Sequence, residues 1–167
     1  YMGLDQMGGS IYAIVAGRVG AKQRLLHLEI VQSDTPFRRA AELMALYRVR
    51  YCAVENLPNF NEAHRFAKTF PGRVFVVHYQ DHADDLVTWG DRPGESAATR
   101  RSEDEVKTRY TAAVDQYKMM SLALSRWVQG EVETPDARTL TQRLRTDQGE
   151  RLVKVCWDPT LGFWFLL

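Results

Sequence analysis

Two acidic side chains, Asp5 and Glu55, stand at the ends of apolar stretches that have the pattern of buried strands. Asp5 closes the first stretch and precedes the pair Gly8-Gly9, which marks a tight turn, and Glu55 closes a second stretch over 51–55. A carboxylate at the end of a buried strand is costly unless a cation meets it. If the two strands are neighbours, the pair suits a divalent metal, and carboxylate oxygens favour Mg²⁺ or Mn²⁺.

The elements that must position this pair are predicted from hydrophobic periodicity and turn residues. The N-terminal half is predicted to contain strands over 1–5, 11–19 and 23–32, a helix over 36–48, a strand over 51–55, a helix over about 60–70 and a strand over 73–79. The first three strands form an antiparallel meander. The strand–helix–strand alternation that follows implies parallel pairing with right-handed crossovers.

The C-terminal half is less regular. We predict a long mobile loop over 81–104 with a small hairpin around 86–89, a strand over 106–111, helices over 114–129 and 136–145, and a strand over 151–157 paired with 162–167. Gly and Pro residues and a run of charges in the segment 81–104 are typical of a loop. No internal repeat is present.

The length of the chain predicts a single domain over 1–167, and we expect this domain to be a piece of a longer chain. The 22 Lys and Arg residues against 21 Asp and Glu give a net charge of +1, so any nucleic-acid site must be a local patch. No apolar run reaches the roughly 20 residues of a membrane span, and no secretory signal is visible. Cys52 and Cys156 lie in apolar runs and are expected to be free thiols in a reducing compartment.

This order of elements predicts an α/β fold of the ribonuclease-H-like kind, in which a mixed central sheet combines an antiparallel meander with parallel strands and is flanked by helices. In that topology the strands that end in Asp5 and Glu55 are neighbours at the centre of the sheet. Their carboxylates could share two metal ions about 3.5–4 Å apart, which clamp a phosphodiester for attack by water.

The local motifs extend this interpretation. Gly3-Leu-Asp-Gln6 followed by Gly8-Gly9, together with Cys52-Ala-Val-Glu-Asn-Leu-Pro58, resembles the nuclease domain of the large terminase subunit of tailed bacteriophages. Pro71-Gly-Arg-Val-Phe-Val-Val-His-Tyr79 and the segment 106–130 are similar to later parts of that family, so the resemblance covers nearly the whole chain.

The resemblance implies a metal-dependent endonuclease that cuts concatemeric viral double-stranded DNA during genome packaging in the cytoplasm of the infected bacterial host. It implies an ATPase motor domain, a portal and a small terminase subunit as partners, and no membrane. No G-x-x-x-x-G-K-[ST] motif occurs here, so the motor is expected elsewhere. By match of motif, Asp5 and Glu55 would be catalytic metal ligands.

The sequence departs from the family in its third acidic ligand, which family members place near the end of the domain in a helix-opening motif. The last segment here offers only Asp158, in Cys156-Trp-Asp-Pro159. Either Asp158 is the third catalytic metal ligand, or that ligand lies beyond residue 167, which we favour. Read alone, an aspartate before proline is an ordinary turn residue.

Basic residues that flank the long loop are candidates for contact with DNA phosphates without reading sequence. They are Arg100, Arg101, Lys107 and Arg109, and each could equally be a solubilising surface charge. A group of histidines and aspartates follows the 73–79 strand, but its irregular spacing fits a solvated turn better than a zinc site. Its members are His78, Asp81, His82, Asp84 and Asp85.

Other classes of function compete with the nuclease. The glycine turn after Asp5 also resembles the phosphate hairpin of actin-like ATPases, but no second Asp-x-Gly hairpin follows and such a core needs roughly twice this length. A catalytically silent ribonuclease-H-like docking module is the other alternative, and the unmatched third acid is the argument for it.

Overall fold

The computed structural model describes residues 1–81, 84–89, 110–134, 141–158 and 163–166. Its N-terminal part is the predicted antiparallel meander of β1 (Met2–Met7), β2 (Ser10–Val19) and β3 (Lys22–Gln32). Gly8 and Gly20 make the turns between these strands, and both have positive φ angles (58° and 61°), which residues with a Cβ rarely adopt. The meander is therefore set by glycine at both of its reversals.

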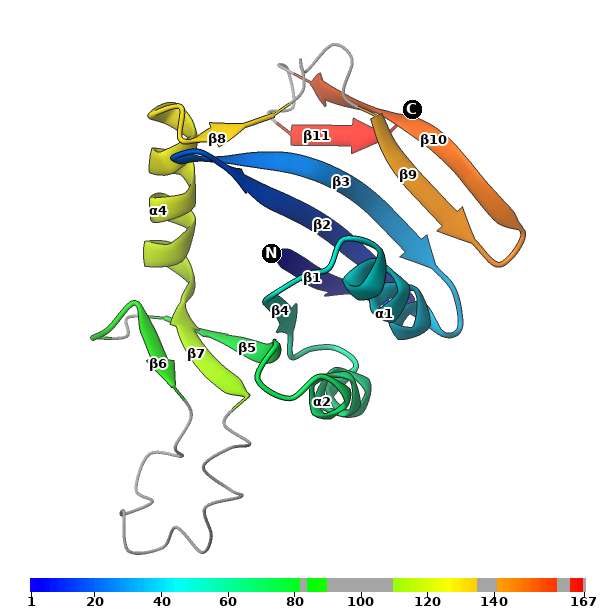
Figure 1. The fold of residues 1–167 in the computed structure, drawn as a ribbon, viewed down its shortest axis with the longest axis horizontal. Coiled ribbons are helices and arrows are strands. Elements are labelled where there is room, and N and C mark those ends of the chain that lie inside the picture. The colour runs from blue at the N-terminus through cyan, green and yellow to red at the C-terminus, as the bar shows by residue number, and fades with distance from the viewer. Residues whose placement is uncertain (82–83, 90–109, 135–140, 159–162, 167) are drawn as a thin grey trace, which may run out of the picture.

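Helix–strand alternation follows the meander as predicted (Figure 1). The elements are α1 (Pro36–Leu46), β4 (Cys52–Glu55), α2 (Phe60–Thr69) and β5 (Val74–Gln80). Strand β4 pairs in parallel with both β1 and β5, so the predicted parallel pairing is confirmed. Pro36 occupies the first turn of α1, where its missing N–H costs nothing.

The next segment contains β6 (Val87–Trp89), β7 (Thr111–Asp115), α4 (Gln116–Val128) and the short β8 (Val132–Glu133). The hairpin predicted around 86–89 is wrong, because β6 pairs antiparallel with β7, not with its own neighbours. The strand in this region is β7 over 111–115, where Ala112, Ala113 and Val114 are buried in the sheet, so the strand predicted over 106–111 shares only Thr111 with it. Residues 90–109 lie outside the described part of the chain.

The C-terminal strands are β9 (Thr141–Thr146), β10 (Gly149–Asp158) and β11 (Phe163–Leu166). The helix predicted over 136–145 is wrong from residue 141 onward, because this segment pairs in parallel with β3 and antiparallel with β10. Pairing on both sides outweighs a weak local helix preference. The predicted pairing of 151–157 with 162–167 is confirmed by the antiparallel register of β10 and β11.

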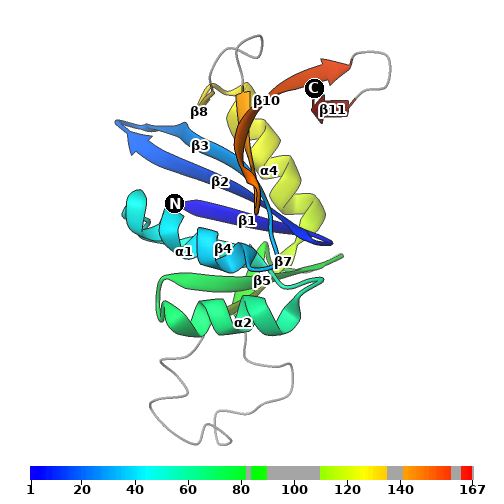
Figure 2. The same ribbon diagram turned by 90° about the vertical axis from the view of Figure 1, so that its right-hand side faces the viewer.

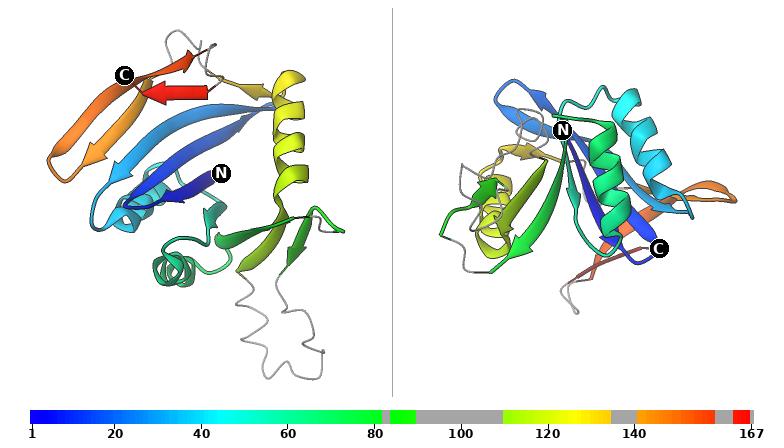
Figure 3. Two further views of the ribbon diagram at one scale, coloured as in Figure 1. Left: turned by 180° about the vertical axis from the view of Figure 1, so that it is seen from behind. Right: turned by 90° about the horizontal axis from the view of Figure 1, so that it is seen from below.

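The strands form one mixed sheet in the order β11-β10-β9-β3-β2-β1-β4-β5-β7-β6, with β8 beside β3. Helices α1 and α2 cover one face of the sheet, and α4 lies on the other side (Figures 2 and 3). The chain therefore has the predicted α/β fold, in which an antiparallel meander continues into parallel strands between flanking helices. Strands β1 and β4 are adjacent at its centre.

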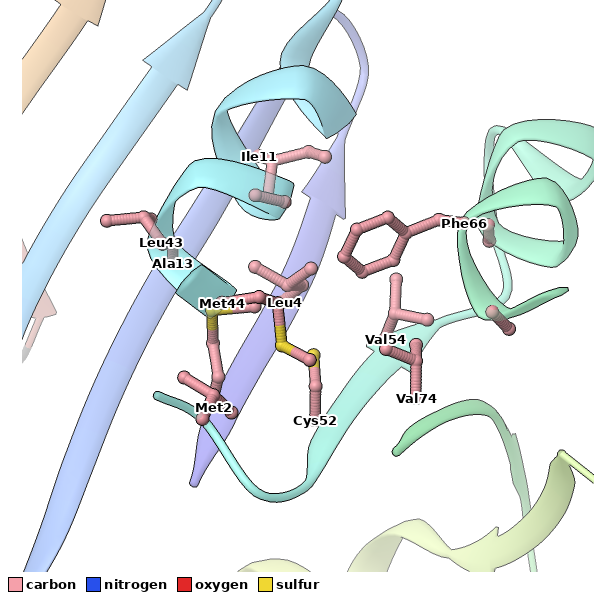
Figure 4. Packing of buried hydrophobic residues seen from close by; sticks show 14 of the residues in the cluster. Met2, Leu4, Ile11, Ala13, Leu43, Met44, Cys52, Val54, Phe66 and Val74 are labelled. Atoms are coloured by element: carbon pink, nitrogen blue, oxygen red, sulfur yellow. The ribbon is translucent and has the colours of Figure 1, made fainter. Parts of the chain in front are cut away.

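The main hydrophobic core fills the space between the sheet and the helices α1 and α2 (Figure 4). Each helix contributes a buried stripe at the spacing i, i+3, i+4, which is what one helical face presents to a sheet. The stripes are Ala40, Leu43 and Met44 in α1 and Ala63, Phe66 and Ala67 in α2. Cys52 is a free thiol in this core, as predicted, and burial raises its pKa to about 12.

A buried ion cluster on the α1 side of the sheet joins β3, α1 and β9. Glu29 is fully buried, and its carboxylate accepts hydrogen bonds from Arg39 Nε (2.9 Å) and Arg145 Nε (2.9 Å). His27 Nε2 lies 2.6 Å from the same carboxylate, and its Nδ1 lies 3.0 Å from the Tyr47 hydroxyl, so both ring nitrogens of this buried histidine have partners within the fold. The cluster links the meander to strand β9.

Candidate metal site

Asp5 and Glu55 lie side by side on the sheet face opposite the main core. The parallel register pairs Leu4 of β1 with Val54 of β4, and both of these side chains are buried in the core. Because successive side chains of a strand point to opposite faces, the next residues, Asp5 and Glu55, point to the other face. Asp5 is exposed and Glu55 is half-buried. The structure thus brings together the two carboxylates that the sequence predicted to be neighbours.

The strand ends that carry the pair are fixed by local hydrogen bonds. The backbone N–H of Gln6 donates to Glu55 Oε2 (3.2 Å), and the backbone N–H of Asn56 donates to the carbonyl of Val77 in β5 (2.8 Å). Pro58, two residues beyond Asn56, cannot donate to a ladder and helps to stop β4 at this point. Both carboxylates therefore lie just beyond the last register pair of β1 with β4, while β1 itself continues beside β2 to Met7.

The electrostatic surroundings of the pair are unfavourable to two negative charges. Burial, the hydrogen bond with Asp5 and the charge of Asp5 together raise the pKa of Glu55 to about 7, against the opposing effect of the hydrogen bond from the Gln6 N–H. Among the ion pairs made by the described residues, none involves Asp5 or Glu55. Near neutral pH the Glu55 carboxyl is therefore about half protonated, and a cation beside the pair would favour loss of that proton.

A hollow of about 460 Å³ opens on the face that carries the pair. Besides the two carboxylates it is lined by Tyr12 of β2, Tyr79 of β5 and Met119 of α4. Burial raises the pKa of Tyr79, and the charges of Glu55 and Asp5 add to that shift. A larger hollow of about 810 Å³ lies beside the Gly8-Gly9 turn and the start of α1 and contains neither carboxylate. The chemistry is therefore assigned to the smaller hollow.

The third predicted ligand is not placed beside the pair. Asp158 ends strand β10, and β9, β3 and β2 lie between β10 and β1 in the sheet order. With strands about 4.8 Å apart, β10 lies on the order of 19 Å from β1 along the sheet. Within the described residues, no group of three or more His, Cys, Asp or Glu side chains is arranged to hold a metal ion.

Asp115 is a further acid that ends a central strand, but it faces away from the pair. Tyr79, on the face of the pair, is in register with Val114, so the next residue, Asp115, points to the opposite face. Its side chain accepts a hydrogen bond from the Lys118 backbone N–H (2.8 Å) and caps helix α4. A helix-capping role accounts for this buried carboxylate.

The remaining predicted site residues lie outside the described part of the chain or at exposed positions at the end of β5 and after it. The candidate DNA contacts Arg100, Arg101, Lys107 and Arg109 lie outside the described residues, and so does His82. His78, Asp81, Asp84 and Asp85 lie at the end of β5 and in the segment that follows, on exposed positions.

Two neighbours of the pair were missed in the sequence. Strand alternation places Tyr79 on the same face as Val77, but the register of Val77 with Glu55, which brings that face to the pair, is seen only in the structure. Gln6 follows Asp5 directly, but its buried side chain has no signal in a single sequence. Both residues reach the site because of the way the strands pair, and the local sequence pattern does not reveal that pairing.

No protein-family model, curated protein or solved structure matches the chain. Among the described residues, no helix has both the length and the apolar character needed to cross a membrane. The geometry of the site and the motifs that surround it are therefore what indicates a function.

Proposed function

We propose that the chain is a metal-dependent endonuclease that cuts viral double-stranded DNA during genome packaging. The observation that carries the proposal is the adjacency of Asp5 and Glu55 on neighbouring central strands, with no cation of the described protein beside them. Two oxygen ligands that share one face and one hollow form the part of a site that a divalent cation completes. The motifs that resemble the terminase nuclease surround these two residues.

The residues present fit Mg²⁺ or Mn²⁺. Such ions would supply Lewis-acid activation of water and stabilise the charge that develops on a phosphodiester. The role of Asp5 and Glu55 is to bind and orient the ions at the strand ends. Glu55 must give up its proton for this, so we expect ion binding to strengthen as the pH rises through about 7.

The described residues supply two of the expected protein ligands. Mg²⁺ usually keeps several waters and is held by one or two carboxylates together with substrate phosphates. A two-metal site, as the family resemblance implies, calls for a further acid. We propose a residue outside 1–167 for it, because β10, which ends at Asp158, is four strands away from β1 in the sheet.

The proposed substrate is double-stranded DNA, with Arg100, Arg101, Lys107 and Arg109 as candidate phosphate contacts. The ATPase motor domain, the portal, the small terminase subunit and the host cytoplasm are proposals that follow from the family resemblance alone.

A catalytically silent docking module is the second candidate function. The observation that favours it is the apolar character of the sheet face and of α4, which has no side chain buried by the part of the chain that the structure describes. Exposed apolar residues here include Ile14, Leu26, Leu124 and Val128. A silent module would bind a partner through this surface and would not cut DNA.

Incubation of supercoiled plasmid DNA with the protein and Mn²⁺ or Mg²⁺ tests the nuclease. We expect Asp5→Asn and Glu55→Gln each to lower the cleavage rate more than about 100-fold, since loss of mere outer-shell partners of a metal already costs about 10–100-fold. Glu42→Gln is the matched control, because Glu42 is an exposed acid of α1 that pairs with Arg39. Cleavage that survives both site substitutions would exclude the assignment.

A further inference from the structure

We infer that Gln6 is the positioning residue that holds Glu55 against Asp5. This inference rests on the proposed metal site and deepens it. It assigns to Gln6 no contact with substrate or ion, only control of where the Glu55 carboxylate stands.

The side chain of Gln6 is buried between two exposed neighbours in β1. It is 4% exposed, whereas Asp5 and Met7 on either side of it are exposed. Strand alternation turns Gln6 to the face that α1 and α2 cover, away from the carboxylates. A buried amide is costly unless both its donor and its acceptor are satisfied. The hydrogen-bond partners of the Gln6 amide therefore indicate its role.

Both ends of the Gln6 amide bind the segment that begins at Glu55. Nε2 donates to the Glu55 backbone carbonyl, and Oε1 accepts from the backbone N–H of Asn59 (3.3 Å). The backbone N–H of the same residue donates to the Glu55 carboxylate. Gln6 thus holds Glu55 at its main chain and at its side chain at once.

The hydrogen bonds of Gln6 lie just beyond the last register pair of β1 and β4. The register pairs between β1 and β4 end at Leu4 and Val54, one residue before the two carboxylates. Beyond that point the strands are joined by Gln6 in place of a regular ladder. Without the amide, the Glu55 carbonyl and the Asn59 N–H lose a buried partner. Glu55 is then held on the β5 side, through its register with Val77, but not on the β1 side that carries Asp5.

The substitutions Gln6→Leu, Gln6→Glu and Gln6→Asn separate the possible roles of the residue. Leu keeps the approximate volume and removes both hydrogen bonds. Glu keeps the length but, when ionised, accepts only and cannot donate to the Glu55 carbonyl. Asn keeps the amide on a shorter side chain. Gln80→Leu is the matched control, because Gln80 also ends a strand of this sheet and lies half-buried.

Three measurements test the inference, after urea unfolding has shown that each variant is folded. Calorimetry with Ca²⁺ should give about 10–100-fold weaker binding for Gln6→Leu, the size found for residues that orient metal ligands. Mn²⁺-dependent cleavage should lose kcat with little change in KM for DNA, and Gln6→Asn should recover part of the loss. Hydrogen exchange followed by NMR should show faster exchange of the residue 6 amide, because its acceptor, the Glu55 carboxylate, has moved.

The exchange measurement needs neither metal nor DNA, so it separates the two proposals. Faster exchange of the residue 6 amide in Gln6→Leu, with no change in Gln80→Leu, supports the positioning role. A wild-type protein that neither binds metal nor cuts DNA would overturn the proposed function but not the positioning role. A folded Gln6→Leu variant with wild-type exchange at residue 6 would overturn the positioning role. So would wild-type metal affinity and cleavage in that variant.

Discussion

Glu29 and Glu55 are glutamates on strands of the same sheet, but their surroundings move their pKa values in opposite directions. Burial would raise the pKa of Glu29, yet hydrogen bonds from His27, Arg39 and Arg145 outweigh it and lower the pKa to about 2. Burial and the adjacent Asp5 raise the pKa of Glu55 to about 7. Among the described residues, two arginines pair with the Glu29 carboxylate, whereas none of the ion pairs involves Glu55, which lies beside a like charge.

This difference separates a structural carboxylate from a candidate functional one. A fully paired buried acid binds parts of the fold together, and nothing further can bind to it without breaking those pairs. An acid that is held next to another acid, on an open face, retains its capacity to bind a cation. Burial alone would predict the higher pKa for Glu29, because Glu29 is the more buried of the two residues. The partners of each carboxylate therefore decide the difference.

The largest effect on stability is expected from Glu29→Gln. Removal of this charge leaves Arg39 and Arg145 without their shared partner, and breaking a buried pair costs about 3 kcal/mol of unfolding free energy. The folded pKa of about 2 lies below the ordinary 4.5, so this contribution is present above about pH 4.5 and is lost as the pH falls toward 2. Urea unfolding across that pH range measures it.

Glu42→Gln, which also removes a partner of Arg39, is the control for this prediction. Glu42 is exposed, so its loss should cost less than about 1 kcal/mol. If Glu29→Gln were no less stable than this control, the claim that Glu29 is a structural acid that stabilises the fold would be wrong.

The opposite sign is expected for Glu55→Gln. The folded pKa of about 7 lies above the ordinary 4.5, so the folded protein holds a proton that the unfolded chain releases between these values. The stability of the wild type should therefore fall as the pH rises from about 4.5 to 7. After discount for solvent screening, Glu55→Gln should be more stable than wild type by about 1 kcal/mol above pH 7 and equal to it near pH 4.5.

Urea unfolding in metal-free buffer with a chelator measures this difference, since a bound cation would reverse it. A Glu55→Gln variant less stable than the wild type at every pH would show that Glu55, like Glu29, is a structural acid.

The smallest effect is expected at Tyr79. Burial raises the pKa of its hydroxyl, with smaller contributions from Glu55 and Asp5. Asp5→Asn should lower that pKa while leaving it above the ordinary 10, because burial persists. Ultraviolet titration of the phenolate reports it, with Tyr79→Phe identifying the signal of this residue. An unchanged titration in Asp5→Asn would place the Asp5 charge outside the hollow that Tyr79 lines.

Most of the N-terminal half of the fold could be predicted from the sequence, because local signals decide it. Glycines at positive φ set the turns of the meander, and the stripes of α1 and α2 have helical spacing. The segment 141–146 could not be predicted in this way. Its strand conformation depends on β3, which lies more than a hundred residues away in the chain, and on the ion pair between Arg145 and Glu29.

Some residues of the candidate site could be predicted from the sequence, and others could not. Asp5 and Glu55 could be predicted because each follows an apolar strand, and topology makes those strands neighbours. The roles of Gln6 and Tyr79 depend on which residues face each other across strands, which one sequence does not show. The third acid stays a prediction.

The link between Glu29 and Arg145 also bears on the order in which the chain acquires its structure. The two residues are separated by 116 positions, whereas the contact of Gln6 with Glu55 spans 49. Closing a longer loop costs more entropy, and a chain emerging from the ribosome presents its N-terminal segments first. We therefore expect the strands that carry the acid pair to form before β9, which would then dock on β3 of an existing sheet.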